Sequence, residues 1–212
     1  LIEHEVPFPI NNEDDFIDSF LSKVNKRTKV IFISHITSPS SIIFPVQKIC
    51  DYCNEKKIIS IIDGAHVPGH IPLDIKSLNP DFYSGACHKW MCSPKGVSFL
   101  YAKKSNQEMI EPLIVSWGYK AEKPSHSQFL DYLQWQGTND ISAYLTIPSV
   151  IDNISDEKWK NKVAVCKDNI QEVRKIILQK FDFTEFSKLN YNLQMHSIVP
   201  VSYTHLTLPT NA

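Results

Sequence analysis

The chain has 212 residues, which favours one domain or one and a fraction. Hydrophobic residues make up 42% and charged residues 21%, a composition typical of a globular protein. The formal net charge of -1 gives no electrostatic reason to expect nucleic acid or an anionic membrane as partner. No apolar run in the sequence has the length needed to span a bilayer. Composition therefore favours neither a nucleic-acid-binding nor a membrane-spanning protein.

The cysteines and arginines add two expectations. Five cysteines, at positions 50, 53, 87, 92 and 166, form no even disulfide framework, which favours a reducing, cytoplasmic setting. Only Arg27 and Arg174 are arginines. A site that binds a substrate carboxylate normally uses an arginine fork. Part of any such site is therefore expected outside these residues.

Four short apolar runs predict β-strands, at residues 30–34, 58–62, 82–84 and 97–101. Between the first two, apolar residues recur at helical spacing over 44–57, with Pro45 in the first turn of the predicted helix. Strand, helix and strand in this rhythm indicate an α/β fold with a mainly parallel sheet.

Polar residues gather where the first three predicted strands end. Ser34 and His35 follow the first strand, Asp63 to His66 the second, and His88 and Lys89 the third. Open α/β sheets bind ligands just beyond the carboxyl ends of their strands. The three strand ends therefore predict one crevice.

The second half of the chain is predicted to be mostly helical. A polar loop over 120–136 precedes helices at 141–151 and 159–179, and a strand begins at 181–183. The second helix carries an apolar stripe formed by Val163, Cys166, Ile170, Val173 and Ile177. Residues 201–212 continue no earlier pattern and resemble a translated sequencing adapter, so we expect a non-native tail there.

Asp63 and Lys89 have the chemistry that a pyridoxal 5'-phosphate (PLP) enzyme needs. Its lysine forms a Schiff base with the cofactor aldehyde, and its carboxylate keeps the pyridine nitrogen protonated. Taken alone the pair is a weak signal, because an Asp at a strand end is commonly a turn former and a loop lysine is usually solvated.

The surrounding motifs are more specific. They are SHITSP at 34–39, DGAHVPG at 63–69, DFYSGACHKW at 81–90, PKG at 94–96, VSWGY at 115–119 and QGTND at 136–140. With these motifs in this order, the chain resembles the class V aminotransferase family of fold type I PLP enzymes, and within it the isopenicillin N epimerase-like branch. The resemblance covers about residues 1–180.

The resemblance implies an incomplete three-layer, PLP-dependent transferase-like large domain over 1–150. A connecting helix and the start of a smaller C-terminal domain would follow over 151–200. It also implies that the segment before Leu1 supplies a phosphate-binding turn and the residue stacked on the ring. The segment after Pro200 would supply most of the small domain and commonly a carboxylate-binding arginine. We therefore expect these 212 residues alone to bind PLP poorly, and the complete protein to bind it covalently.

The same resemblance implies roles for individual residues. Lys89 would carry the cofactor and then transfer the proton, and Asp63 would pair with the pyridinium nitrogen. His66 would act beside the Schiff base and the phenolic oxygen, to which Ser38 would also bond. His88 would bind the phosphate, and Thr138 would bind the phosphate of a neighbouring subunit, which implies a homodimer.

Several of these residues also have ordinary structural explanations. His66 and Ser38 fit turns, and Thr138 fits a helix cap. Ala86 stands where relatives usually carry a polar cofactor contact, a departure that removes one hydrogen bond. Cys50 and Cys53 have a redox or metal spacing, but their apolar neighbours favour buried core cysteines, and no metal site is predicted.

Three functional hypotheses follow. The first is a PLP enzyme that acts at the α-carbon of a small amino-acid-type substrate by epimerisation or transamination, with cysteine desulfurase or C–S lyase chemistry as the alternative outcome. The second is a non-catalytic scaffold, favoured by Ala86. The third is a redox or metal protein that uses Cys50 and Cys53.

Overall fold

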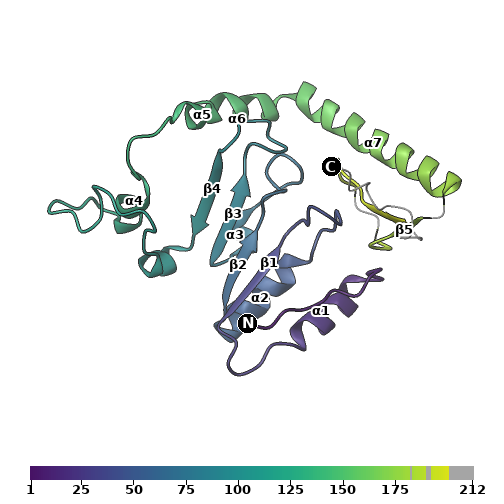
Figure 1. Cartoon of the computed structure of the whole chain (residues 1–212), viewed down its shortest axis with the longest axis horizontal. Helices are drawn as coiled ribbons and strands as arrows, with labels where there is room; N and C mark the ends of the chain where they lie inside the picture. Colours follow the sequence, from purple (N-terminus) through teal and green to yellow (C-terminus); the bar gives the residue numbers. More distant parts are fainter. Residues whose placement is uncertain (182, 190–191, 201–212) are drawn as a thin grey trace, which may run out of the picture.

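The computed structural model describes residues 1–181, 183–189 and 192–200. Its centre is a four-stranded sheet in the order β1-β2-β3-β4 (Figure 1). The strands are β1 (Val30–Ser34), β2 (Ile59–Asp63), β3 (Phe82–Ala86) and β4 (Ser98–Ala102). The first three are parallel and β4 is antiparallel to β3, so the predicted α/β fold with a mainly parallel sheet is confirmed.

The register of the parallel strands aligns their carboxyl ends. Ser34 pairs with Asp63, and Asp63 pairs with Ser84. On β2, Ser60 and Ile62 are fully buried while the alternate residues Ile59, Ile61 and Asp63 are half-buried, as expected for a strand with one face more covered than the other. The loops that leave β1, β2 and β3 therefore start at the same end of the sheet.

Helix α2 (Val46–Lys56) joins β1 to β2 and supplies much of the core. Val46, Ile49, Cys50 and Cys53 are its buried residues. Burial raises the pKa of Cys50 to about 12 and that of Cys53 to about 11, so both thiols stay protonated. The predicted buried core cysteines are confirmed, whereas Pro45 is the N-cap rather than a residue of the first turn.

Two further helices flank this region. Helix α1 (Glu13–Leu21), which was not among the predicted elements, is capped by the side chain of Asn12 and buries Phe16 against Phe44 at 4.7 Å between ring centroids. Helix α3 (Ile75–Leu78) lies between β2 and β3, and the Asp74 side chain caps it. Local capping thus sets where both helices begin.

The second half contains more breaks than its sequence pattern predicts. It comprises η1 (Lys104–Met109), α4 (Gln128–Leu133), α5 (Ser142–Leu145), α6 (Ile147–Ser155), α7 (Glu157–Lys180), β5 (Phe183–Glu185) and β6 (Ile198–Pro200). The predicted loop contains α4. The predicted helix at 141–151 is divided into α5 and α6, because Pro148 in the first turn of α6 cannot continue an earlier helix.

Helices α5 and α6 pack on the turn after β3, where Ala143, Ile147, Val150 and Ile154 contact the cluster of Cys87, Met91 and Val97. Figure 1 shows α7 running from α6 toward the small β5–β6 pair. On α7 the predicted stripe is only partly correct: Val163, Ile170 and Ile177 are half-buried, whereas Cys166 and Val173 are exposed.

The predicted division at residue 150 falls inside α6, and it stays a prediction. The predicted tail at 201–212 lies outside the described residues. In the described part of the chain, no helix has the length and apolar character to cross a membrane. Within the same residues, no group of three or more His, Cys, Asp or Glu side chains is placed to hold a metal ion.

Candidate active site

The turns that leave β2 and β3 bring the two predicted catalytic residues together. His66 lies in the turn after β2, and Lys89 lies in the turn directly after β3. The distance from Lys89 Nζ to His66 Nε2 is 2.9 Å, a hydrogen bond between side chains 23 residues apart in sequence. Both side chains are half-buried, so the pair is partly shielded and still accessible.

Asp63 supplies a carboxylate at the same end of the sheet. It is the last residue of β2, and its Oδ1 accepts a hydrogen bond of 2.9 Å from the Ala65 backbone N–H. Burial lowers the pKa of the His66 ring, and the charge of Asp63 opposes that shift. A carboxylate held by backbone at a strand end can face a cationic ring and remain ionised.

His66 is held in the neutral form. Burial is the largest cause that lowers its pKa, and a charged Lys89 lowers it further against the opposing effect of Asp63. A neutral imidazole has one N–H and one lone pair, so its tautomer decides which neighbour receives a proton.

The other predicted cofactor-binding residues occupy separate positions. His88, the residue before Lys89, donates its Nδ1–H to the Val97 carbonyl at 3.0 Å, and this hydrogen bond orients its ring. Ser38 is exposed in the turn after β1, and Thr138 is exposed in the connection between α4 and α5. The structure therefore assembles Asp63, His66 and Lys89 at one place, while the roles of Ser38, His88 and Thr138 stay predictions.

Four aromatic side chains near this site were assigned no role from the sequence. Trp90 donates its Nε1–H to His66 Nδ1 at 3.2 Å, and the rings of Trp90 and His70 are 4.2 Å apart. At the end of β1, His35 Nδ1 lies 3.0 Å from the Tyr83 hydroxyl. The spacing of His66 and His70 by four residues, and a tryptophan directly after Lys89, were the only sequence signals for these contacts.

Burial keeps the His35–Tyr83 pair uncharged. It lowers the pKa of His35 to about 4 and raises the pKa of Tyr83 above its ordinary value. A Cβ on Gly64 would lie 2.2 Å from the Tyr83 ring, so only glycine permits this approach directly after Asp63. The neutral His35–Tyr83 pair is therefore packed closely against the residue that follows Asp63.

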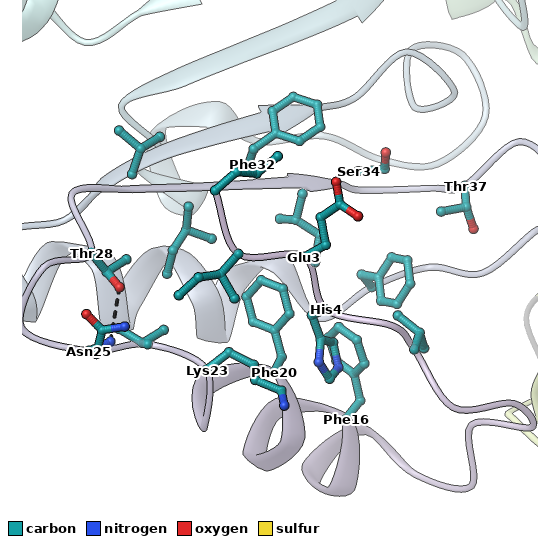
Figure 2. A pocket seen from close by; sticks show the side chains of 18 of the residues that line it. Glu3, His4, Phe16, Phe20, Lys23, Asn25, Thr28, Phe32, Ser34 and Thr37 are labelled. Atoms are coloured by element: carbon teal, nitrogen blue, oxygen red, sulfur yellow. Dashed lines mark hydrogen bonds between the residues drawn. The ribbon is translucent and has the colours of Figure 1, made fainter.

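A large apolar cavity lies elsewhere, alongside the edge strand β1. Its volume is about 1110 Å³, and Figure 2 shows Phe16 and Phe20 of α1 and Phe32 of β1 around it, with His4 between them. Asp63, His66 and Lys89 are not among its lining residues. Size alone would select this cavity, but the charged and hydrogen-bonding groups lie at the ends of β2 and β3.

The site residues fit PLP. Asp63 offers the carboxylate for a pyridinium nitrogen, Lys89 the amine for the aldehyde, and His66 an imidazole hydrogen-bonded to that amine. Ala86 is buried and offers no polar side-chain group, as the sequence indicates. A lysine and a carboxylate at the carboxyl ends of adjacent parallel strands in an α/β sheet are the two groups that a PLP-dependent enzyme requires.

The comparisons with known proteins agree with this class. The family model for "Aminotransferase class-V" matches residues 6–208, and the chain therefore belongs to the class V aminotransferase family. This confirms the predicted family and PLP as its cofactor.

The chain matches only part of the length of its individual relatives. The chain is 32% identical over 153 residues to isopenicillin N epimerase of Amycolatopsis lactamdurans, which covers 68% of the chain and 38% of that protein. It is 29% identical over 181 residues to L-cysteine desulfhydrase of Arabidopsis thaliana, covering 82% and 38%. The chain thus spans about two fifths of the length of these relatives.

Solved structures confirm the fold. A cysteine desulfurase from Escherichia coli superposes with a TM-score of 0.71 at 14% sequence identity, covering 89% of this chain and 48% of that one. The cysteine desulfurase from Thermococcus onnurineus NA1 gives a TM-score of 0.61 at 18% identity, covering 73% and 39%. At such identities the likeness concerns the fold alone.

Proposed function

We propose that the protein acts at the α-carbon of an amino acid or amino-acid derivative, with Lys89 as the residue that carries PLP. The observation that supports this most is the 2.9 Å contact between Lys89 Nζ and His66 Nε2, next to Asp63 at the carboxyl ends of β2 and β3. PLP, when bound, supplies an aldehyde for the lysine and an electron sink for charge that develops at the α-carbon.

The chain's own groups would then divide the work. Lys89 Nζ takes and returns the α-proton, which requires a flexible amine at the edge of the site. The Asp63 carboxylate would pair with the pyridine nitrogen of PLP and favour a proton there. His66 orients the amine through its hydrogen bond, and His88, whose ring is fixed by Val97, contacts the phosphate.

Arg174 is not available to bind a substrate carboxylate. Arg174 forms a fork with Glu185, with Nη2 2.8 Å from Oε2, and so its guanidinium is already paired with a carboxylate.

A second candidate outcome is cleavage of a carbon–sulfur bond in a cysteine-type substrate. The similarity to the plant L-cysteine desulfhydrase favours it, because that match covers 82% of the chain.

Assembly and location complete the proposal. The protein works as a homodimer in which Thr138 reaches the phosphate of the neighbouring subunit's cofactor, consistent with its exposure. Free cysteines at five positions support a reducing, cytoplasmic setting.

The test is borohydride reduction of the whole protein after loading with PLP, followed by peptide mass spectrometry. We expect a pyridoxyl group on Lys89, no such label in Lys89→Ala, and full labelling in the control Lys95→Ala, whose lysine is exposed in the next turn. Label spread over surface lysines in the unaltered protein would instead support the non-catalytic scaffold.

The two candidate outcomes separate in one further assay. Epimerisation or transamination exchanges the α-hydrogen of the substrate with deuterium oxide without releasing sulfide. Carbon–sulfur cleavage of L-cysteine releases sulfide at the rate at which the substrate is consumed. Sulfide release that depends on Lys89 would establish the second outcome.

A further inference from the structure

A short segment near the end of the described chain packs against the turn after β2. This docking segment comprises residues 192–197, directly before β6. Its Leu193 is 1% exposed and packs in a buried cluster with Val67, which lies in that turn. Farther along the segment, the Ser197 hydroxyl lies 2.8 Å from the hydroxyl of Ser41, in the loop after β1. Apolar packing and a hydrogen bond therefore hold the docking segment at two points.

His70 connects the docking segment to the turn that carries His66. Its Nε2 accepts a hydrogen bond of 2.8 Å from the Gln194 backbone N–H, and its Nδ1 lies 3.0 Å from the His66 carbonyl oxygen. These two neighbours fix the proton on the ring, because a backbone N–H can only donate and a carbonyl oxygen can only accept. His70 therefore carries its proton on Nδ1, which donates to His66, and a lone pair on Nε2.

Burial keeps the His70 ring in this neutral form. The residue is 3% exposed, and burial lowers its pKa to about 4. The hydrogen bond to the His66 carbonyl opposes that shift, whereas the charge of Lys167 on α7 adds to it. A second proton would lie on Nε2 and would face the N–H of Gln194. The contact with the docking segment therefore belongs to the neutral ring.

The same ring also reaches the turn that carries Lys89. The centroid of the His70 ring is 4.2 Å from that of the Trp90 ring, and Trp90 directly follows Lys89. A Cβ on Gly69 would lie 2.7 Å from the Trp90 carbonyl oxygen, so the two turns approach closely beside His70. His66, whose carbonyl accepts from His70, contacts Lys89 Nζ at 2.9 Å. One buried ring thus contacts the docking segment and both turns of the site.

We propose that His70 is a positioning residue that couples the docking segment to the Lys89–His66 pair. With residues 192–197 in place, His70 is held between the Gln194 N–H and the His66 carbonyl, and its ring packs beside Trp90. Without the segment, His70 Nε2 would be a buried acceptor that has lost its partner, which is unfavourable. The docking segment therefore influences the placement of Lys89 through His70.

The hydrogen bond to Gln194 can be measured in the whole protein without PLP. Hydrogen–deuterium exchange, followed by mass spectrometry with fragmentation to single residues, reports the protection of the Gln194 amide. We expect protection in the unaltered protein and about tenfold faster exchange in His70→Phe, which keeps a ring and removes both hydrogen bonds. Tenfold corresponds to about 1.4 kcal/mol, the size of one net hydrogen bond. The control His126→Phe, at an exposed histidine before α4, should leave the exchange unchanged.

The coupling itself is measured at Lys89. Lysines of the PLP-free protein are acetylated with limiting acetic anhydride, and peptide mass spectrometry gives the labelling rate of Lys89 relative to the exposed Lys95. We expect this ratio to rise about two- to tenfold in His70→Phe, the range for one net hydrogen bond, because the turn that holds His66 against Lys89 loosens. His70→Gln has a side-chain oxygen that can accept from Gln194 and an amide that can donate, so it should restore both measurements toward those of the unaltered protein.

Three results would overturn the inference: an unprotected Gln194 amide in the unaltered protein, an unchanged Lys89 ratio in His70→Phe, or a larger disturbance in His70→Gln than in His70→Phe. The last would show that His70 acts only through the packing of its ring. The first needs no variant. If His70→Phe fails to fold, Leu193→Ala, which removes the apolar contact of the docking segment, should raise the same two rates, and an unchanged Lys89 ratio there would also overturn the coupling.

The inference rests on the proposed function only for its purpose, because both measurements are made without cofactor or substrate. An intact coupling with no borohydride label on Lys89 would contradict the enzyme proposal alone. A label on Lys89 together with an unprotected Gln194 amide would contradict only the role of His70.

Discussion

The sheet region, residues 30–102, and the helical region, residues 128–180, differ in how far their side chains are buried. In the sheet region Ile49, Ile62 and Tyr83 have no exposed surface. Helices α4 to α7, all of whose residues are described, contain no buried residue, and Leu145 is 70% exposed. The sheet region therefore fixes the site through its own register and packing, whereas the helical region depends on few contacts for its position.

The largest effect is expected from the charge at the end of β2. Asp63→Asn removes the carboxylate that would keep the pyridine nitrogen protonated, and we expect the rate of α-hydrogen exchange with deuterium oxide to fall by about 10²–10³-fold. The control Asp51→Asn changes an exposed carboxylate on α2 and should leave the rate unaltered. Equal exchange rates in the two variants would show that the Asp63 carboxylate has no role in the reaction.

The packing contrast itself can be tested with one substitution made in both regions. Ile49→Ala in α2 removes a side chain with no exposed surface and should lower the free energy of unfolding by about 2–5 kcal/mol. Ile151→Ala in α6, at a residue that is 47% exposed, should stay within about 0.5 kcal/mol. Urea denaturation of the whole protein measures both. Similar losses would mean that the helical region is covered in the complete molecule.

The buried His35 predicts how stability depends on pH. Burial lowers its pKa from the ordinary 6.5 to about 4, so as the pH falls below 6.5 the unfolded chain takes up a proton before the folded one. The free energy of unfolding contributed by this residue therefore decreases toward pH 4, by about 3 kcal/mol. His35→Gln, which can still hydrogen-bond Tyr83, should reduce the slope of the curve measured by denaturation between pH 4 and 7, to which the buried His70, with a pKa also lowered to about 4, contributes as well. An unchanged slope would contradict a neutral buried His35.

The smallest effect concerns the approach of the two turns. Gly69 and Gly96 both have positive φ, +77° and +92°, but only at Gly69 would a Cβ meet other atoms. Gly69→Ala and Gly96→Ala share the conformational strain, about 1–2 kcal/mol. We expect Gly69→Ala to cost about 1 kcal/mol more, because the Trp90 backbone must move. Thermal unfolding of the two variants measures the difference, and equal losses would show that the contact is not tight.

Much of the sheet and of the site was predictable because the signals are local. Short apolar runs, the first two rich in β-branched residues and the last two containing aromatic residues, predicted all four strands to within about two residues at each end, since such side chains fit a pleated, buried surface. The polar motifs directly after three of these strands predicted that Asp63, His66 and Lys89 would meet. Parallel register then brings consecutive strand ends to the same place, as the pairing of Ser34, Asp63 and Ser84 shows.

The helical region was less predictable. Apolar periodicity over 141–151 indicated one helix, and the structure has a break before Ile147. The stripe on α7 was assigned from spacing, but Cys166 and Val173 face away from the contacts that α7 makes. Periodicity shows which residues share a face of a helix, and it does not show whether another element covers that face.

The sequence by itself determined the class of this protein: the α/β layering, the family motifs, and the lysine, carboxylate and histidine that are proposed to carry the chemistry. Only the tertiary structure decided which atoms touch. That Trp90 donates to His66 Nδ1, and that the His70 ring lies beside the Trp90 ring and accepts a hydrogen bond from the Gln194 backbone, depends on rotamers and on the close approach at Gly69. Hydrogen bonds require distances near 3 Å and defined angles, and these are set by the packing of segments far apart in the chain.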